Sequence, residues 1–260
     1  MRRQPKTMRF LALDTMINWA IQVAKSVNTA RLKTYDLLEL VVGDALILLT
    51  LWTSGSTQQA LLITSATWIV MTTFLLPDKT ELSGLRPSGL EHSWWIIVAA
   101  AGMGAAAVGI AARMGTLHLP PGFARHAWRA WAYVAFAFVQ QFILQNYFLL
   151  RLRHLVSKTY IAVGIAALLF SLAHLPNPLL TLTTLVWGLV ACLLFLRCRD
   201  LYALALAHAI LGLGIAFTIP NAIHHQMRVG LGYLTYRSDV RAHSVEPKQP
   251  NSIHASMGDH

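Results

Sequence analysis

Charged side chains are scarce in this sequence. Only 12% of the 260 residues are Asp, Glu, Lys or Arg, whereas 55% are hydrophobic. This composition excludes a disordered chain and is unusually apolar for a soluble domain. Acidic residues are missing altogether between Glu91 and Asp200. A site formed within that stretch must therefore work without a carboxylate, or take one from a distant segment such as Asp44 or from the substrate.

Cysteine is equally sparse, which excludes two kinds of site. The chain holds only Cys192 and Cys198, six residues apart in one apolar run. Six helical residues correspond to about 600° of rotation, so the two thiols point to different sides of a helix. Neither a disulfide framework nor a cysteine-based metal motif surrounds them. We interpret both residues as reduced thiols in the core.

Long apolar runs are what the sequence has in abundance. A helix needs ~20 apolar residues to cross a bilayer. Runs near this length lie at residues 37–53, 59–76, 94–113, 128–150, 159–174, 179–196 and 201–219. The sequence therefore predicts an all-α fold, a polytopic transmembrane helical bundle of about seven spans, within a range of six to eight.

Basic residues indicate how the bundle is oriented. The formal net charge is +10. Nucleic acid attracts such a charge, but in a membrane protein Lys and Arg mark cytoplasmic loops and contacts with anionic lipid. With the N-terminus placed inside, the inner loops hold more Lys and Arg than the outer ones. We expect an integral protein of a bacterial inner membrane, with a cytoplasmic N-terminus, lipid around it and no nucleic-acid partner.

The chain divides into four regions by polarity. They are a basic cytoplasmic segment with an interfacial amphipathic helix (1–35), N-terminal spans with a connector (36–126), a core carrying polar motifs (127–219) and a polar tail (220–260). The last 25 residues have the composition of a disordered segment. The tail also contains His224, His225 and Arg228. These residues either overhang a site in the membrane or form a basic interfacial segment with Tyr233 as its anchor.

Polar side chains inside the apolar runs are the candidates for function. Four amides lie within seven residues of one span: Gln140, Gln141, Gln145 and Asn146. An unpaired amide in hydrocarbon costs free energy, so such groups face a partner or a cavity. Later spans each carry one histidine, His174 and His208. Asp44 lies within the first span, where it either pairs structurally or belongs to a site.

These residues leave three interpretations open. Taken singly, each histidine fits a hydrogen-bonded core residue, and the glutamines fit bridges between helices. Taken together, they fit one shared polar site. Histidine can bind a metal or deprotonate water, whereas glutamine can only hydrogen-bond. Two histidines on separate spans also fit a haem- or metal-binding protein.

Three short patterns occur in order within the core: Gln140-Gln141-Phe-Ile-Leu-Gln145, Phe170…His174 and His208…Gly212. They resemble the motifs of the CPBP family of intramembrane endopeptidases, which includes the CAAX prenyl proteases and bacteriocin-processing proteins. Those motifs are Glu-Glu-x-x-x-Arg, Phe-x-x-x-His and His-x-x-x-Asn or Asp. The second is intact here. Glutamines replace the charged residues of the first, and Gly212 stands at the last position of the third.

The resemblance implies a CPBP-like core and hydrolysis of a membrane-anchored protein or peptide. It places Gln140, His174 and His208 where the family positions and activates water, with Gln141 and Gln145 completing the first motif. Phe170, Asn177, Gly212 and Asp44 are the expected supporting residues. The cofactor is either none or a divalent metal such as zinc, held by His174 and His208. The alternative within this fold is an inactive scaffold or immunity-like binding protein, because the motif carboxylates are missing.

Overall fold

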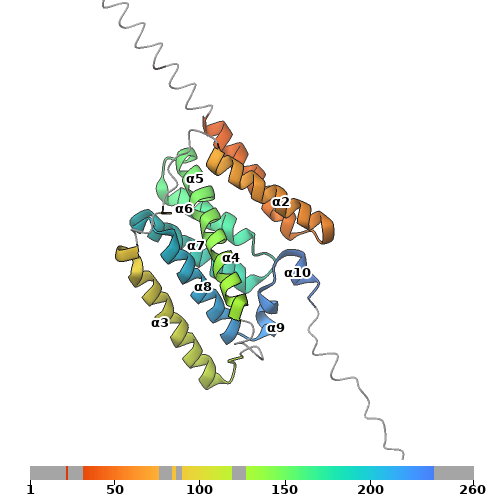
Figure 1. The fold of residues 1–260 in the computed structure, drawn as a ribbon, viewed down its shortest axis with the longest axis vertical. Helices are drawn as coiled ribbons and strands as arrows, with labels where there is room; N and C mark the ends of the chain where they lie inside the picture. Colours follow the sequence, from red (N-terminus) through yellow and green to blue (C-terminus); the bar gives the residue numbers. More distant parts are fainter. Residues whose placement is uncertain (1–21, 23–31, 76–83, 86–89, 119–126, 237–260) are drawn as a thin grey trace, which may run out of the picture.

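The computed structural model describes residues 22, 32–75, 84–85, 90–118 and 127–236 (Figure 1). Three predicted features lie outside these residues: the amphipathic N-terminal helix, most of the connector after the second span, and the disorder expected for the end of the tail. In the described part every regular element is a helix and none is a strand. The all-α prediction is confirmed. The four-region division stays a prediction.

The helices follow the predicted apolar runs. In chain order they are residues 32–51, α2 (Gly55–Val70) with the π-helix η1 (Met71–Leu75), α3 (Leu90–Met114), α4 (Ala127–Phe142), the π-helix η4 (Ile143–Leu149), α5 (Leu150–Leu155), α6 (Thr159–Leu172), α7 (Pro178–Cys198) and α8 (Leu201–Thr218). Three short elements end the described chain: α9 (Asn221–His224), η5 (His225–Met227) and α10 (Gly230–Leu234). Because α4, η4 and α5 follow without a break, they form one long helical segment.

Several of these helices can cross a membrane. Four of the described helices are long and apolar enough to do so: Leu90–Met114, Trp128–Leu155, Pro178–Cys198 and Leu201–Thr218. The apolar helix Thr159–Leu172 is shorter. Large apolar side chains also face outward, for example Trp131, which is 75% exposed. An outer surface of this kind suits lipid, so the chain is an integral membrane protein built as a helical bundle. The count of seven spans stays a prediction.

The bundle is arranged around α8. This helix packs against both α3 and α4, while α6 packs against α7 and η4. Figure 1 shows α3 on one side of the bundle and the N-terminal pair, residues 32–51 with α2, on the other. Small residues permit the close packing. A Cβ added at Gly188 of α7, for instance, would lie 3.2 Å from Ala167 of α6. The predicted core thiols agree with this arrangement, since Cys192 is free and buried and Cys198 is free and half-buried.

Local sequence sets where the two helices around the site begin. Asn177 caps α7, accepting the Leu180 N–H at 3.2 Å, and Pro178 follows at the first helical position. Asp200 caps α8, accepting the N–H groups of Tyr202 and Ala203. Both are favourable helix starts, because a side-chain oxygen satisfies N–H groups that the first turn leaves unpaired.

Candidate active site

Phe170 brings the two predicted histidines together. Phe170 lies in the last turn of α6, and His174 lies four residues later in the turn that follows, so the two side chains remain on one side. The Phe170 ring is 5.1 Å from the His174 ring and 6.0 Å from the His208 ring, which comes from α8. Both histidines are buried. The two later motifs therefore meet at one place in the bundle.

Gln141 joins the first motif to the same place. Its Nε2 lies 2.9 Å from Nδ1 of His208, and its Oε1 accepts a hydrogen bond from Gln145 Nε2 at 3.3 Å. Both glutamine side chains are fully buried. The amide nitrogen of Gln141 can only donate, so Nδ1 of His208 is the acceptor. The chain of amides thus assigns the proton of neutral His208 to Nε2.

His174 carries its proton on the other ring nitrogen, Nδ1. Its Nδ1 lies 2.9 Å from the carbonyl oxygen of Phe170. A carbonyl only accepts, so Nδ1 carries the proton and Nε2 keeps its lone pair. The site therefore offers one imidazole with a free basic nitrogen and one with a free N–H. Such a pair can accept a proton from one atom while donating a hydrogen bond to another.

Two further polar atoms at this place have no partner among the described residues. They are Oε1 of Gln145 and Nε1 of Trp187, both buried. The Trp187 ring of α7 lies 5.9 Å from the His208 ring. Buried polar atoms are almost always satisfied in native proteins, by water or a ligand where protein offers nothing. One acceptor and one donor are therefore available here for a bound molecule.

Tyr133 occupies the position where the third motif departs from the family pattern. A Cβ added at Gly212 would overlap the Tyr133 hydroxyl. Gly212 is one turn beyond His208 on α8. Tyr133 lies on α4 at the helical spacing i, i+4, i+8 with Ala137 and Gln141, and so on the face turned toward α8. Its hydroxyl has no hydrogen bond within the described part of the chain. No motif pointed to Tyr133 or Trp187; the spacing along α4 was the one available signal for Tyr133.

Other predicted residues lie apart from this cluster. Gln140 is half-buried and its side chain makes no hydrogen bond to a described residue, so Gln141, its neighbour, is the amide that contacts His208. Asp44 likewise has no hydrogen bond to the described residues, although its Oδ1 is buried. Asn177 caps α7 and donates to two backbone carbonyls after α8. Among the described residues, no carboxylate is hydrogen-bonded to His174 or His208.

The side chains at this site do not fit a catalytic zinc ion. Such an ion takes three protein ligands. Among the described residues no three His, Cys, Asp or Glu side chains gather in a metal-binding arrangement. The Nδ1 of His208 is also occupied by Gln141, and its Nε2 carries the proton. The predicted metal on His174 and His208 finds no support in this donor set.

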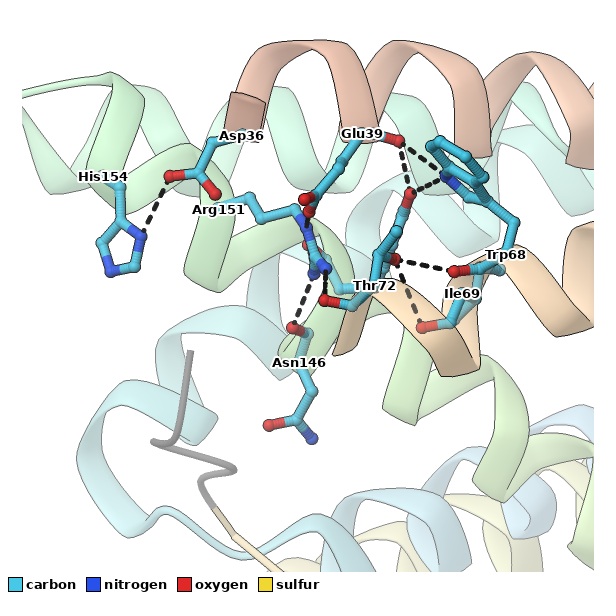
Figure 2. A network of polar contacts seen from close by, with 9 residues as sticks. Asp36, Glu39, Trp68, Ile69, Thr72, Asn146, Arg151 and His154 are labelled. Carbon is cyan, nitrogen blue, oxygen red and sulfur yellow. Dashed lines mark hydrogen bonds and ion pairs between the residues drawn. The ribbon is translucent and has the colours of Figure 1, made fainter. Parts of the chain in front are cut away.

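A buried ion pair fixes the helix that carries Gln145. Figure 2 shows Arg151 of α5 pointing at Glu39 of the 32–51 helix, with Nε 3.0 Å from Oε2. The same guanidinium donates to the carbonyl oxygens of Asn146, Tyr147 and Thr72 at 3.4, 3.1 and 3.1 Å. Four hydrogen bonds therefore satisfy one buried cation. They tie the N-terminal pair to the end of η4.

Tyr147 strengthens the same connection. Its hydroxyl donates to the Glu39 carbonyl oxygen and accepts from Trp68 Nε1 at 3.1 Å. Its ring lies 4.0 Å below the Arg151 guanidinium carbon. Tyr147 belongs to η4, where the wider π-turn places Gln145 to Leu149 in the core. Such π-segments are frequent at functional sites, because they turn side chains that an α-helix would leave in other directions.

Comparison with known proteins agrees with this arrangement. Residues 122–213 match the family model described as type II CAAX prenyl endopeptidase Rce1-like. No curated protein and no solved structure matches the chain. The matched segment contains all three motif patterns, from Gln140 to Gly212, and thus the helices that bring His174 and His208 together. The match over residues 122–213 therefore supports the resemblance of this segment to the CPBP family, the membrane protease family of the CAAX type.

Proposed function

We propose that this protein is a divergent intramembrane endopeptidase of the CAAX-protease type, in which His174 is the general base. The observation that supports this proposal is the complementary pair of imidazoles. Nε2 of His174 is a free base, and Nε2 of His208 is a free donor beside the same Phe170 ring. A base and a donor at neighbouring positions are what the attack of water on an amide requires.

The proposed reaction uses each group in turn. Water bound at Nε2 of His174 loses a proton to that nitrogen as its oxygen attacks the scissile carbonyl carbon. The carbonyl oxygen becomes an oxyanion, which accepts hydrogen bonds from His208 Nε2 and Trp187 Nε1. His174 then returns the proton to the amide nitrogen, the C–N bond breaks, and an acid and an amine leave. Removing one such oxyanion donor typically costs about 10²–10³-fold in kcat.

The glutamines serve as positioning groups in this scheme. Gln141 holds Nδ1 of His208 as an acceptor, so that the proton stays on the nitrogen that faces the substrate, and Gln145 holds Gln141 in turn. The free Oε1 of Gln145 can accept a hydrogen bond from the substrate or from water. Gln140 keeps its predicted role of orienting the water or the scissile carbonyl. None of the three can replace His174 as the base.

Tyr133 supplies a further donor. Its hydroxyl lies over Gly212, one turn from His208. A phenol is neutral near pH 7 and can donate a hydrogen bond to an oxyanion. We assign Tyr133 the place left vacant by the missing motif side chain.

The surroundings of the site suggest where its substrate comes from. The histidines lie among apolar helices, several of which can cross a bilayer. A substrate anchored in the membrane reaches such a site more readily than a soluble one. We propose a membrane-associated protein or peptide as the substrate and a bacterial inner membrane, with the N-terminus in the cytoplasm, as the location.

Cleavage of membrane-anchored peptides by the purified protein in lipid nanodiscs tests this function. The wild-type protein should release product, and His174→Ala and His208→Ala should each abolish release. His92→Ala is the matched control, because His92 is an exposed histidine at the start of α3 and should be dispensable. Absence of cleavage across a broad peptide panel, or cleavage that survives His174→Ala, would reject the proposal.

One observation favours a second candidate, a binding protein that has lost hydrolysis. The amide of Gln141 is committed to His208, and the described residues bring no carboxylate to the site. Under this candidate the wild-type protein binds a membrane-anchored peptide without cutting it, and Gln140→Glu or Gln141→Glu creates turnover. Turnover by the wild-type protein would eliminate this candidate.

A further inference from the structure

The chain after α8 closes one end of the bundle. We call residues 219–236 the closing strap. It runs beside the turn that follows His174: the Gly230 N–H donates to the Leu175 carbonyl oxygen at 2.7 Å. Figure 1 shows α9 and α10 at the end of the bundle away from α5, near the start of α2. At that end a Cβ added to Gly230 would overlap the Leu51 carbonyl oxygen, so the strap packs directly on backbone.

A single side chain ties down both ends of a strained loop in the strap. Nδ2 of Asn177 donates to the carbonyl oxygens of His224 at 2.9 Å and Arg228 at 3.1 Å. The three residues between these anchors, His225 to Met227, have φ values of 50°, 54° and 60°. None is glycine, and L-residues rarely adopt this left-handed conformation. Such strain persists only while surrounding contacts hold it, so the loop will relax if an anchor is lost.

His224 is the anchor that can change with conditions. It is 1% exposed, and its Nδ1 accepts the Met227 N–H at 3.1 Å, inside the strained loop. Neutral His224 therefore carries its proton on Nε2, which is buried and has no partner among the described residues. The His118 ring lies 6.2 Å away and nearly parallel. Its Nδ1 donates to the Thr116 carbonyl oxygen, so its unpartnered Nε2 is an acceptor. The two rings thus offer one donor and one acceptor, a match that one water can bridge.

Protonation of His224 in acid should break its hydrogen bond with the Met227 N–H. A second proton on His224 would sit on Nδ1, so two N–H groups would face each other where Met227 now donates. The new positive charge would lie near His118 and His225, with His174 on the neighbouring turn. Tyr233 and Tyr236 lie against the His225 ring, and the Arg228 guanidinium lies over the Tyr236 ring. Residues 51–54, 178–188 and 209–218, from the other elements near the strap, contain no titratable side chain. Within the described residues no carboxylate is hydrogen-bonded to His224 or His118.

We propose that the closing strap is a pH-sensitive lid over the turn that carries His174, and that His224 is its latch. At neutral pH the latch holds the left-handed loop against Asn177. Protonation of His224 removes an acceptor, adds a buried charge and lets the loop relax, so the strap lifts. The inference concerns access to the site and does not require that the site hydrolyse peptides. If the proposed function holds, lifting admits water and substrate beside His174.

The direction of the pH effect follows from linkage. Burial lowers the pKa of His224, the backbone of Ile219 opposes this shift, and the nearby His118 and His225 add to it, so the net direction is downward. In the lifted strap His224 regains an ordinary pKa of about 6.5. The closed state then binds fewer protons than the open state, so closure is complete above this pH and weakens as the pH falls below it. For one histidine the open population rises about tenfold for each pH unit below about 6.5, as long as His224 stays neutral in the closed state.

Hydrogen exchange of the full chain in lipid nanodiscs measures the lid directly. The readout is the protection of the Met227 and Gly230 amides at pH 7.5 and 5.5, after correction for the intrinsic pH dependence of exchange. Wild-type protein and the control His92→Gln should lose protection about tenfold at pH 5.5. His224→Asn keeps an acceptor for the Met227 N–H but cannot titrate, so its protection should not change with pH. Asn177→Ala should lose protection at both pH values.

Two results would overturn the proposal: unchanged protection in the wild-type strap at pH 5.5, or an equal loss in His224→Asn. Protection of α3 and α8 amides reports whether each variant is folded. If His224→Asn does not fold, His224→Ala carries the same test, because it also cannot titrate. Peptide cleavage is not part of this readout, so a failed lid and a failed proposed function are told apart.

Discussion

Breaking the ion pair between Arg151 and Glu39 should separate the N-terminal helices from the core. Both side chains are buried and 3.0 Å apart. Removing one partner of a buried pair typically costs about 3–5 kcal/mol, because the other charge is left buried. Glu39→Gln should fall at the lower end of this range, since Arg151 keeps three carbonyl partners. Arg151→Met should fall at the upper end, because the Glu39 carboxylate then loses its cation.

The double variant Glu39→Gln with Arg151→Met removes both charges of this pair. Its cost should be smaller than the sum of the single variants by at least about 1.5 kcal/mol, as expected for residues that act as one unit. The free energy of unfolding, measured by steric trapping in bicelles, gives these values. His154→Ala is the control, because the His154 side chain is 62% exposed in its pair with Asp36 and should contribute under about 1 kcal/mol. Strictly additive costs, or single variants as mild as the control, would refute the reasoning.

Three further predictions concern the site. Gly212→Ala should destabilise the fold by about 1–3 kcal/mol, because its methyl group overlaps the Tyr133 hydroxyl. Tyr133→Phe should restore part of this loss in thermal unfolding, since it removes the hydroxyl but leaves the ring carbon 2.9 Å away. Gln141→Leu should lower kcat about 10²-fold with little change in KM, because His208 loses the partner that assigns its proton; an unchanged kcat would count against the amide chain. Dialysis against a zinc chelator should leave peptide cleavage unchanged, and loss of cleavage restored by zinc would show that the donor set was misjudged.

The sequence by itself determined the class of the fold. Apolar runs near the bilayer length are a local property, and each of them became a helix. The motif Phe170…His174 was equally readable, because four residues along a helix place two side chains on one face whatever surrounds them. The cap at Asn177 followed by Pro178 is also local in origin, although the lid contacts of the same side chain are not.

Only the tertiary structure decided which polar groups meet. Gln141 and His208 are 67 residues apart, and Arg151 and Glu39 are 112 apart. Helical period alone could not choose between neighbouring Gln140 and Gln141, because the two differ by about 100° in direction and the direction matters only once α8 is in place. The contact between Tyr133 and Gly212, and that between His224 and His118, likewise arise only from tertiary packing. Such pairs depend on how helices pack, and the packing of a whole bundle is not encoded in any one segment.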